Sequence, residues 1–492
     1  MDKKIPTDSL TDKQKDYATF LPAMSSFFAR DLGKARHEED YILPKRVPQN
    51  FEHGVEGLNY MKSKDTYFYY KWHLYSAGHA DLNMKHFSVR DDIIRNRDRK
   101  DNWVLGDSGG FQIGKGVWEG DWKDPSCPKA KKKREQVLEF MDGNMDYGMI
   151  LDIPAWVSRS PQGAKASNIN SYQEAVDGTK INNDYFMKNR NGNCKFLNVL
   201  QGENFQQADD WYTQMKDYCD PKKYPSTHFN GWAMGGQNMC DIHLALKRLV
   251  ALRFDGLLEK GKHDVMHFLG TSKLEWAVLL TDVQRAIRKY HNENFMITFD
   301  CASPFLASAN GQVYTDIEIK DKAKWVYRMM ASADDKGFAK ETKAFKDAVL
   351  EKGIFPAFRD SPVSARWMLK DITCYNPGDL NKMGNDPKTS WDSFSYTLQM
   401  AHNVWMHITA VQEANQMYDK GINPKMLVQE QFDRIAFKDI VNAVFATSSR
   451  DEANAVIEEF QRFWMSIIGT RGATGKKTVN ASTQFQNLFE EV

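Results

Sequence analysis

The segment Trp103-Val104-Leu105-Gly106-Asp107-Ser108-Gly109-Gly110 joins a short apolar run to a carboxylate and two glycines. An apolar run of this length, bounded by turn residues, predicts a buried strand followed by a loop. The same succession recurs along the chain at intervals of about 30 to 50 residues. The other predicted strands cover 67–73, 149–151, 196–200, 232–234, 265–269 and 296–299.

Helical periodicity separates these runs. In 273–290, for example, Leu274, Ala277, Val278 and Thr281 fall at spacings of three and four residues. Strands that alternate with helices at this interval indicate βα units and a parallel sheet. Six or seven such units favour an α/β protein built as a (β/α)₈ TIM barrel over an open sheet.

The predicted barrel does not account for the whole chain. We expect 1–60 to be an N-terminal extension with short helices and 61–420 to be the barrel, interrupted by a long insertion at about 318–390. A C-terminal helical segment and tail would fill 421–492.

The residues after the last βα unit differ in composition from the barrel. The charged stretch 320–352 is predicted to be helical, and the Pro- and Gly-rich stretch 353–387 to be a long loop. Apolar residues at steps of three or four predict helices over 394–418 and 429–464, and the Gly- and Lys-rich tail from 469 is expected to be mobile.

Charge and cysteine content exclude some classes of protein. Lys and Arg number 66 against 65 Asp and Glu among 492 residues, so a globally basic nucleic-acid coat is excluded but a local basic patch is not. The six cysteines form no closely spaced pair, which suits a reducing compartment. The N-terminus lacks the apolar core of a signal peptide, and no run is long enough to span a membrane, so a cytoplasmic protein is expected.

Polar residues follow the predicted strands at one repeated position. The C-terminal ends of parallel strands converge on one face of a barrel, where active sites lie. Any one of these residues could only cap a helix or turn a loop, but their repetition on consecutive units favours a site. The residues are Asp107, Asp152, Gln201, Gly235, Gly236, Gly270 and Asp300.

Asp107 and Asp300 are the candidate catalytic residues. Each directly follows an apolar run, so its carboxylate should leave the strand end into a partly dry pocket. A pair of such carboxylates suits glycosyl chemistry, in which one group attacks or stabilises the anomeric carbon and the other moves a proton.

Two basic clusters lie on either side of the Asp107 strand in the sequence. A charge run is often only a solvated surface, but here it could contact a phosphate backbone and draw a polyanion to the barrel. The predicted backbone contacts are Arg95, Arg97, Lys131, Lys132, Lys133 and Arg134.

The sequence predicts no metal site. Neither His73 and His79 nor His402 and His407 have the spacing of four residues that pairs two ligands on one helix face. A redox cofactor or nucleoside triphosphate is not expected either.

Several blocks resemble the tRNA-guanine transglycosylases and occur in the same order as in that family. The resemblance covers about 100 to 320 and resumes weakly at 390–420. The blocks are Asp107-Ser108-Gly109-Gly110-Phe111-Gln112, Asp152, Leu200-Gln201-Gly202, Gly231-Trp232-Ala233-Met234-Gly235-Gly236, Phe268-Leu269-Gly270, Phe299-Asp300-Cys301 and Asn310-Gly311-Gln312-Val313-Tyr314-Thr315.

The resemblance implies a (β/α)₈ barrel that exchanges guanine in a polynucleotide for a 7-deazaguanine base. Asp300 would be the nucleophile that holds the sugar as a covalent ester, and Asp107 the general acid and base. Ser108, Asp152, Gln201 and the Gly235-Gly236 backbone would recognise the base edge. Phe111 would stack on the base where the family usually has Tyr, and Leu269-Gly270 would cover its other face.

The chain also departs from the family pattern. The Cys-x-Cys-x-x-Cys zinc ligands expected after the Asp300 strand are missing, since only Cys374 lies in that region, and Val411 occupies the position that matches the zinc histidine. The chain is therefore more similar to the DNA-guanine transglycosylases of bacteria and phages, the DpdA-type enzymes, which would act in the host cytoplasm when phage-encoded.

DNA is accordingly the favoured substrate, with 7-cyano-7-deazaguanine as an example of the incoming base. A duplex would need its target guanine flipped out. The alternatives are a transglycosylase acting on tRNA, a non-catalytic nucleic-acid-binding subunit, and an unrelated barrel hydrolase acting on a sugar. The identity of the 7-deazaguanine and the oligomeric state stay open.

Overall fold

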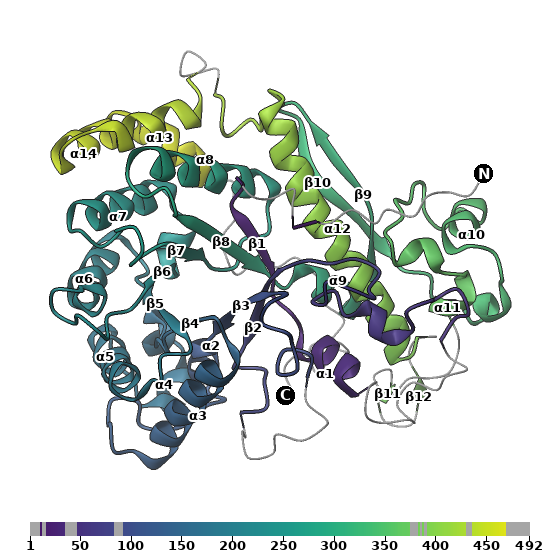
Figure 1. The fold of residues 1–492 in the computed structure, drawn as a ribbon, viewed down its shortest axis with the longest axis horizontal. Helices are drawn as coiled ribbons and strands as arrows, with labels where there is room; N and C mark the ends of the chain where they lie inside the picture. Colours follow the sequence, from purple (N-terminus) through teal and green to yellow (C-terminus); the bar gives the residue numbers. More distant parts are fainter. Residues whose placement is uncertain are drawn as a thin grey trace.

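The computed structural model describes residues 10–11, 16–34, 47–82, 92–373, 382–383, 386–387, 391–429 and 435–468. Eight parallel strands form one sheet in the order β1-β8-β7-β6-β5-β4-β3-β2. A parallel bridge between Ala23 and Leu74 joins the end of β1 to β2 and completes the ring. The predicted (β/α)₈ TIM barrel is confirmed (Figure 1).

Seven of the eight strands coincide with the predicted apolar runs, although the first of these begins five residues later than expected. The strands are β1 (Thr19–Pro22), β2 (Trp72–Ser76), β3 (Trp103–Asp107), β4 (Tyr147–Met149), β5 (Lys195–Leu200), β6 (Gly231–Met234), β7 (Val265–Phe268) and β8 (Met296–Cys301).

The N-terminal part of the chain was wrongly predicted to be only an extension of short helices. Its strand β1 pairs in parallel with β8, so that Phe20 lies opposite Phe299. This strand is only four residues long and no polar residue directly follows it, so the sequence pattern did not reveal it. The barrel therefore begins at Thr19, and helix α1 (Ser26–Lys34) follows its first strand.

Helices connect the strands and cover the outside of the ring, as Figure 1 shows on its left side. They are α2 (Gly110–Gly114), α3 (Pro128–Asn144), α4 (Pro161–Ser167), α5 (Tyr172–Asn189), α6 (Phe205–Met215), α7 (Ile242–Phe254), α8 (Leu274–Tyr290) and α9 (Ser303–Ala309).

The charged stretch after the barrel begins with a β-hairpin, so the helix predicted over 320–352 is wrong for its first part. Strands β9 (Gln312–Lys320) and β10 (Lys324–Ala331) pair antiparallel. Trp325 is buried between the exposed Lys324 and Val326, which is the alternation of a strand. The charged residues around Trp325 hid this two-residue alternation in the sequence.

Helices complete the C-terminal part of the described chain. Between the hairpin and residue 373 lie only short helices, α10 (Phe345–Glu351) and α11 (Leu369–Ile372), and the two-residue strands β11 (Lys382–Met383) and β12 (Asp386–Pro387) follow. The helix predicted over 394–418 is confirmed as α12 (Ser393–Asp419). The segment predicted to be helical over 429–464 holds three separate helices, α13 (Phe437–Ala446), α14 (Arg450–Glu459) and α15 (Gln461–Ile468). The tail from 469 lies outside the described residues.

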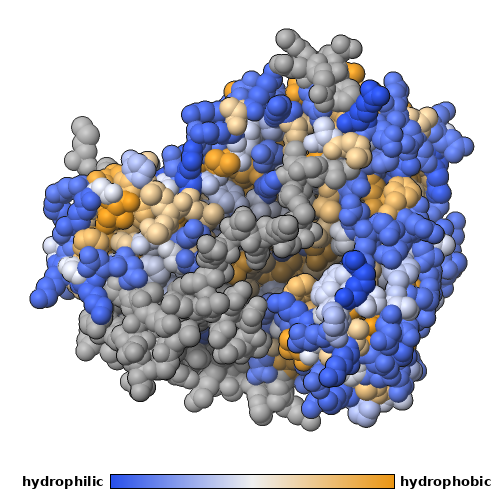
Figure 2. Space-filling view, turned by 180° about the vertical axis from the view of Figure 1, so that it is seen from behind, coloured by the Kyte–Doolittle hydropathy of each residue, from blue (hydrophilic) through white to orange (hydrophobic). Residues whose placement is uncertain are grey.

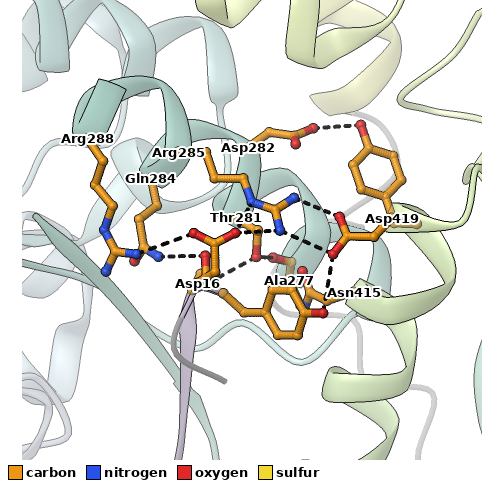
Figure 3. A network of polar contacts seen from close by, with 12 residues as sticks. Asp16, Ala277, Thr281, Asp282, Gln284, Arg285, Arg288, Asn415 and Asp419 are labelled. Carbon is orange, nitrogen blue, oxygen red and sulfur yellow. Dashed lines mark hydrogen bonds and ion pairs between the residues drawn. The ribbon is translucent and has the colours of Figure 1, made fainter. Parts of the chain in front are cut away.

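An ion-pair network joins the N-terminal segment to α8 and α12 (Figure 3). Arg285 of α8 pairs with Asp16 (2.7 Å) and with Asp419 (2.8 Å), so its guanidinium bridges the residues before β1 and the end of α12. Beside it, Tyr418 donates a hydrogen bond to the buried Asp282 (2.7 Å). We call this network the seam, because it holds the first strand against the helices that pack over it.

The face in Figure 2 is mostly hydrophilic, with apolar residues visible in a hollow near its middle. None of the helices in the described ranges is both long and apolar enough to cross a membrane.

Candidate active site

The C-terminal strand ends bring together the carboxylates that the sequence singled out. Asp107 ends β3, Asp300 lies near the end of β8, and Asp152 follows β4. The charge of Asp300 acts on Asp107, and that of Asp107 acts on Asp152, so the three groups share one electrostatic environment.

Asp107 is half-buried and held by neutral donors. Ser76 is its register partner on β2 and donates to Oδ2 at 2.6 Å. Burial raises the pKa of Asp107, the nearby Asp300 raises it further, and the bonds from Ser76 and the Gly109 amide act against this rise. A carboxyl group with a raised pKa is suited to donating a proton near neutrality.

Asp300 is held at one oxygen by two groups of the neighbouring strand and its loop. The Gly270 amide donates to Oδ1 at 2.8 Å, and Nε2 of His267 lies 3.2 Å from the same atom. The side chain is 14% exposed, which leaves part of the carboxylate accessible from the mouth of the barrel.

Asp152 and Gln201 form a buried pair between the ends of β4 and β5. Gln201 Nε2 donates to Asp152 Oδ2 at 2.7 Å. Burial raises the pKa of Asp152 to about 7, the charge of Asp107 adds to the rise, and Gln201 opposes it. The pair combines acceptor oxygens with an amide that has a second hydrogen to donate.

Glycines allow the loops around this pair to approach closely. A Cβ on Gly110 would lie 2.2 Å from the carbonyl oxygen of Asp152, so only glycine fits at the start of α2. Gly236 has φ +55°, and a Cβ there would lie 2.4 Å from the Gly202 oxygen. Both glycines therefore bring backbone against the Asp152–Gln201 pair.

Two of the predicted base-binding amides are already engaged. The Gly235 amide donates to the Leu200 carbonyl at 2.8 Å, and the Gly270 amide binds Asp300 as described above. The amide of Gly236 is therefore the better candidate donor to a base carbonyl.

The other predicted base contacts lie around the same strand ends. Ser108 is buried, and its hydroxyl makes no hydrogen bond within the described part of the chain, which leaves it for a ligand. Phe111 is 54% exposed and packs its ring edge-on against Trp156 at 5.4 Å, so one face can stack on a base. Leu269 is half-buried beside Gly270.

Helix capping does not explain the strand-end carboxylates. The caps of the following helices are other residues: Asn204 for α6, Asp241 for α7 and Ser160 for α4, each of which accepts a backbone hydrogen bond. None of Asp107, Asp152 and Asp300 serves as an N-cap in the described helices. Capping of the following helix therefore does not account for these three carboxylates.

The structure contradicts part of the predicted phosphate contacts. Arg97 is 2% exposed and pairs with Asp146 (2.9 Å), and its guanidinium also donates to the Asn144 carbonyl. Residues that precede a parallel strand lie at the end opposite the candidate site, so this cluster does not flank the strand ends that carry the carboxylates. Arg95 lies over the Phe140 ring and bonds the Asp81 carbonyl.

Only part of the second basic cluster is available to a polyanion. Arg134 is buried and donates to Asn182 at 2.6 Å, which contradicts its predicted role, and Lys133 stacks on Trp118. Lys131 and Lys132 are exposed in the first turns of α3, at the helix end nearest the site. Exposed and buried residues lie close together in this cluster because a helix points consecutive residues to different faces.

The described residues do not fit the zinc site of the resembling family. No group of three or more His, Cys, Asp and Glu within them could hold a metal, and Cys374 lies outside them. Val411 is buried in α12. One turn earlier His407 lies 3.6 Å from Cys301, but these are two possible ligands, and a structural zinc needs four.

Four polar residues at the site were missed by sequence reasoning: Ser76, Asn238, His267 and Thr298. Asn238 is buried and donates to the carbonyls of Gln201 and Gly235, tying two site loops together. His267 and Thr298 lie inside apolar runs, where a polar residue gives little signal. Their importance depends on strand register, which was not known from the sequence.

A scan against protein-family models and a search of curated proteins both find no match for this chain.

Proposed function

We propose that this protein is a guanine transglycosylase that exchanges guanine in DNA for a 7-deazaguanine base. The observation that carries the proposal is the gathering of Asp107, Asp300 and the buried Asp152–Gln201 pair at one end of a (β/α)₈ barrel. Two carboxylates supply glycosyl chemistry, and the Asp152–Gln201 pair near Asp107 matches the edge of a guanine-like base.

Base recognition follows from donors and acceptors. Asp152 accepts hydrogen bonds from the ring N–H and exocyclic amine, and Gln201 with the Gly236 amide donates to the carbonyl oxygen. A base that supplies two donors to Asp152 stabilises its ionised form, which burial disfavours. Phe111 stacks on the base plane.

The reaction has two halves. Asp300 attacks the anomeric carbon, the bond from that carbon to guanine breaks, and the electron pair leaves with guanine while Asp107 supplies a proton. The 7-deazaguanine then gives its proton to Asp107 and attacks the same carbon, which releases Asp300. No group outside the chain and its two substrates is needed to balance these steps.

The exposed Lys131 and Lys132 favour a polyanionic substrate beside the site. The missing zinc motif and the lack of a fitting zinc site in the described residues favour DNA over tRNA, because the family's zinc segment helps to dock tRNA.

The test is incubation of the chain with labelled 7-cyano-7-deazaguanine and, in parallel, duplex DNA, single-stranded DNA and tRNA. Label in DNA supports the proposal, and label only in tRNA replaces the substrate but keeps the chemistry. Release of free base without incorporation would identify a hydrolase. Binding of nucleic acid without either reaction would identify a non-catalytic subunit.

A further inference from the structure

The buried imidazole of His267 lies against the proposed nucleophile. On β8, Thr298 and Asp300 are two residues apart and share one face of the strand, and His267 on β7 is the register partner of Thr298. Its Nδ1 lies 2.9 Å from Thr298 Oγ1 and its Nε2 lies 3.2 Å from Asp300 Oδ1. The ring is fully buried between these two side chains.

The positions of the hydrogens follow from the partners. An ionised carboxylate only accepts, so Nε2 must carry a hydrogen and donate it to Asp300. Nδ1 then faces the Thr298 hydroxyl, which can donate to it or accept from it. The two contacts fix the ring orientation.

The two carboxylate oxygens of Asp300 are therefore not equivalent. Oδ1 receives the His267 bond and the Gly270 amide at 2.8 Å. Oδ2 accepts no hydrogen bond from the residues that the structure describes, so its lone pairs are directed to no protein donor there. A nucleophilic oxygen needs such free lone pairs, whereas an oxygen with two donors has reduced electron density.

We propose that His267 is a positioning residue that, together with the Gly270 amide, clamps Oδ1 of Asp300 and makes Oδ2 the attacking atom. The inference rests on the proposed transglycosylase function, and it adds a residue and an atom assignment to it.

The clamp acts in both halves of the reaction. In the first, Oδ2 forms a bond to the anomeric carbon, the bond to guanine breaks, and guanine takes its electron pair and a proton from Asp107. Oδ1 becomes the carbonyl oxygen of the ester and keeps both donors. In the second, the incoming base attacks the carbon, the bond to Oδ2 breaks, and the returning charge is shared with Oδ1, where the donors stabilise it.

The first experiment compares His267→Leu with His267→Gln. Leu removes the donor, whereas the Gln amide can place N–H near the position of Nε2. We expect His267→Leu to slow formation of the covalent adduct about 100-fold, with the KM for the base little changed, and His267→Gln to restore most of the rate. Equal losses in both variants, or a loss confined to KM, would overturn the positioning role.

Two further variants separate positioning from folding. Thr298→Val keeps the imidazole but removes the hydroxyl that orients it, and we expect a loss between those of the other two variants. His73→Leu is the matched control, because His73 is also a fully buried strand histidine but contacts Tyr60 and Tyr70 rather than the site. Thermal unfolding of every variant shows whether a lost rate reflects lost structure.

The final measurement does not depend on activity. Nitrogen-15 NMR of the histidine-labelled wild-type chain reports which ring nitrogen of His267 carries hydrogen, assigned with His267→Gln, and Asp300→Ala should shift that signal. Hydrogen on Nδ1 alone would overturn the clamp even in an active enzyme. A wild-type chain that exchanges no base would instead overturn the proposed function, while a hydrogen on Nε2 would still confirm the clamp geometry.

Discussion

The candidate active site and the seam both gather aspartates, but their carboxylates have different partners. At the seam, Arg285 pairs with Asp16 and Asp419, and Arg288 lies 3.7 Å from Asp16, so two guanidiniums face these two carboxylates. At the site, Asp107 and Asp152 make no ion pair with Lys or Arg within the described residues, and their hydrogen bonds come from Ser76, the Gly109 amide and Gln201. The seam joins distant segments through ion pairs, whereas Asp107 and Asp152 are held by uncharged donors.

One aspartate from each region shows the same pKa shift, which allows a direct comparison. Burial raises the pKa of Asp152 and of Asp282 to about 7 in each case, and the largest opposing influence is a hydrogen bond from Gln201 or Tyr418. What differs is the neighbouring charge, because Asp152 lies near Asp107 whereas Asp282 lies near Arg285.

The largest effect is expected from Asp300→Asn. Loss of the nucleophile should lower base exchange by about 10³-fold or more and abolish the covalent adduct. The free energy of unfolding should not fall, because Asn can still accept from the Gly270 amide and the substitution removes one of the clustered negative charges. Exchange rates and denaturant unfolding measure the two quantities, and retained exchange would remove Asp300 from its role.

The next effect is a pH-dependent stability change in Asp152→Asn. Because the pKa of Asp152 is about 7 in the folded chain and 3.8 for a solvated aspartate of the unfolded chain, the folded state binds the extra proton between these values. The wild-type chain therefore keeps its full free energy of unfolding below about pH 4 and loses up to about 4 kcal/mol of it as pH rises through 7. Asp152→Asn should therefore gain stability relative to wild type between pH 5 and 8, which urea unfolding at a series of pH values measures.

Asp282→Asn is the matched control for that prediction. It should show the same gain of relative stability with rising pH, because its shift has the same direction and cause. Base exchange should fall in Asp152→Asn and stay near wild type in Asp282→Asn. If both variants lost exchange equally, the distinction between site and seam would not hold.

A smaller effect is expected when the seam itself is broken. Arg285→Met removes both ion pairs of a guanidinium that is partly solvent-exposed, so the loss should be about 1–2 kcal/mol. Lys260→Met, which breaks an exposed pair with Glu293, should cost less than about 1 kcal/mol. Urea unfolding checks both values, and exchange per folded molecule should be unchanged.

The smallest effect concerns the exposed lysines of α3. Lys131→Ala with Lys132→Ala should weaken nucleic-acid binding several-fold and reduce the slope of log affinity against log salt by about 1–2. The control is Lys222→Ala, an exposed lysine that precedes β6 and so lies toward the opposite end of the barrel. Equal salt slopes in all three proteins would place the polyanion elsewhere.

The barrel and its carboxylates could be predicted because they depend on local patterns. Apolar runs marked seven strands, four of them followed by Asp or Gln, and parallel topology alone gathers their ends. Strand β1 was missed because four residues carry little pattern, and the β9–β10 hairpin because charged residues masked its alternation.

Side-chain environments were less predictable than strand positions. Arg97 and Arg134 are as basic in sequence as Lys131, yet each is buried by its own set of partners. His267 stands in an apolar run and contacts Asp300 only because β7 and β8 align it with Thr298. Such roles depend on register and packing between distant segments.

Because β1 pairs with β8, the ring of strands cannot close until β8 has been synthesised. Thr19 pairs with Thr298, so about 280 residues must leave the ribosome before the first strand meets its partner. Non-local pairings of this kind are slow to form, because the entropy cost of closing a long loop comes before the stabilisation that the contacts provide. Strand β8, which carries Asp300, therefore gains its second neighbouring strand only when the ring closes. A nascent chain stalled before β8 would leave β1 as an exposed edge, which makes this short strand the point where chaperone binding and misassembly should concentrate.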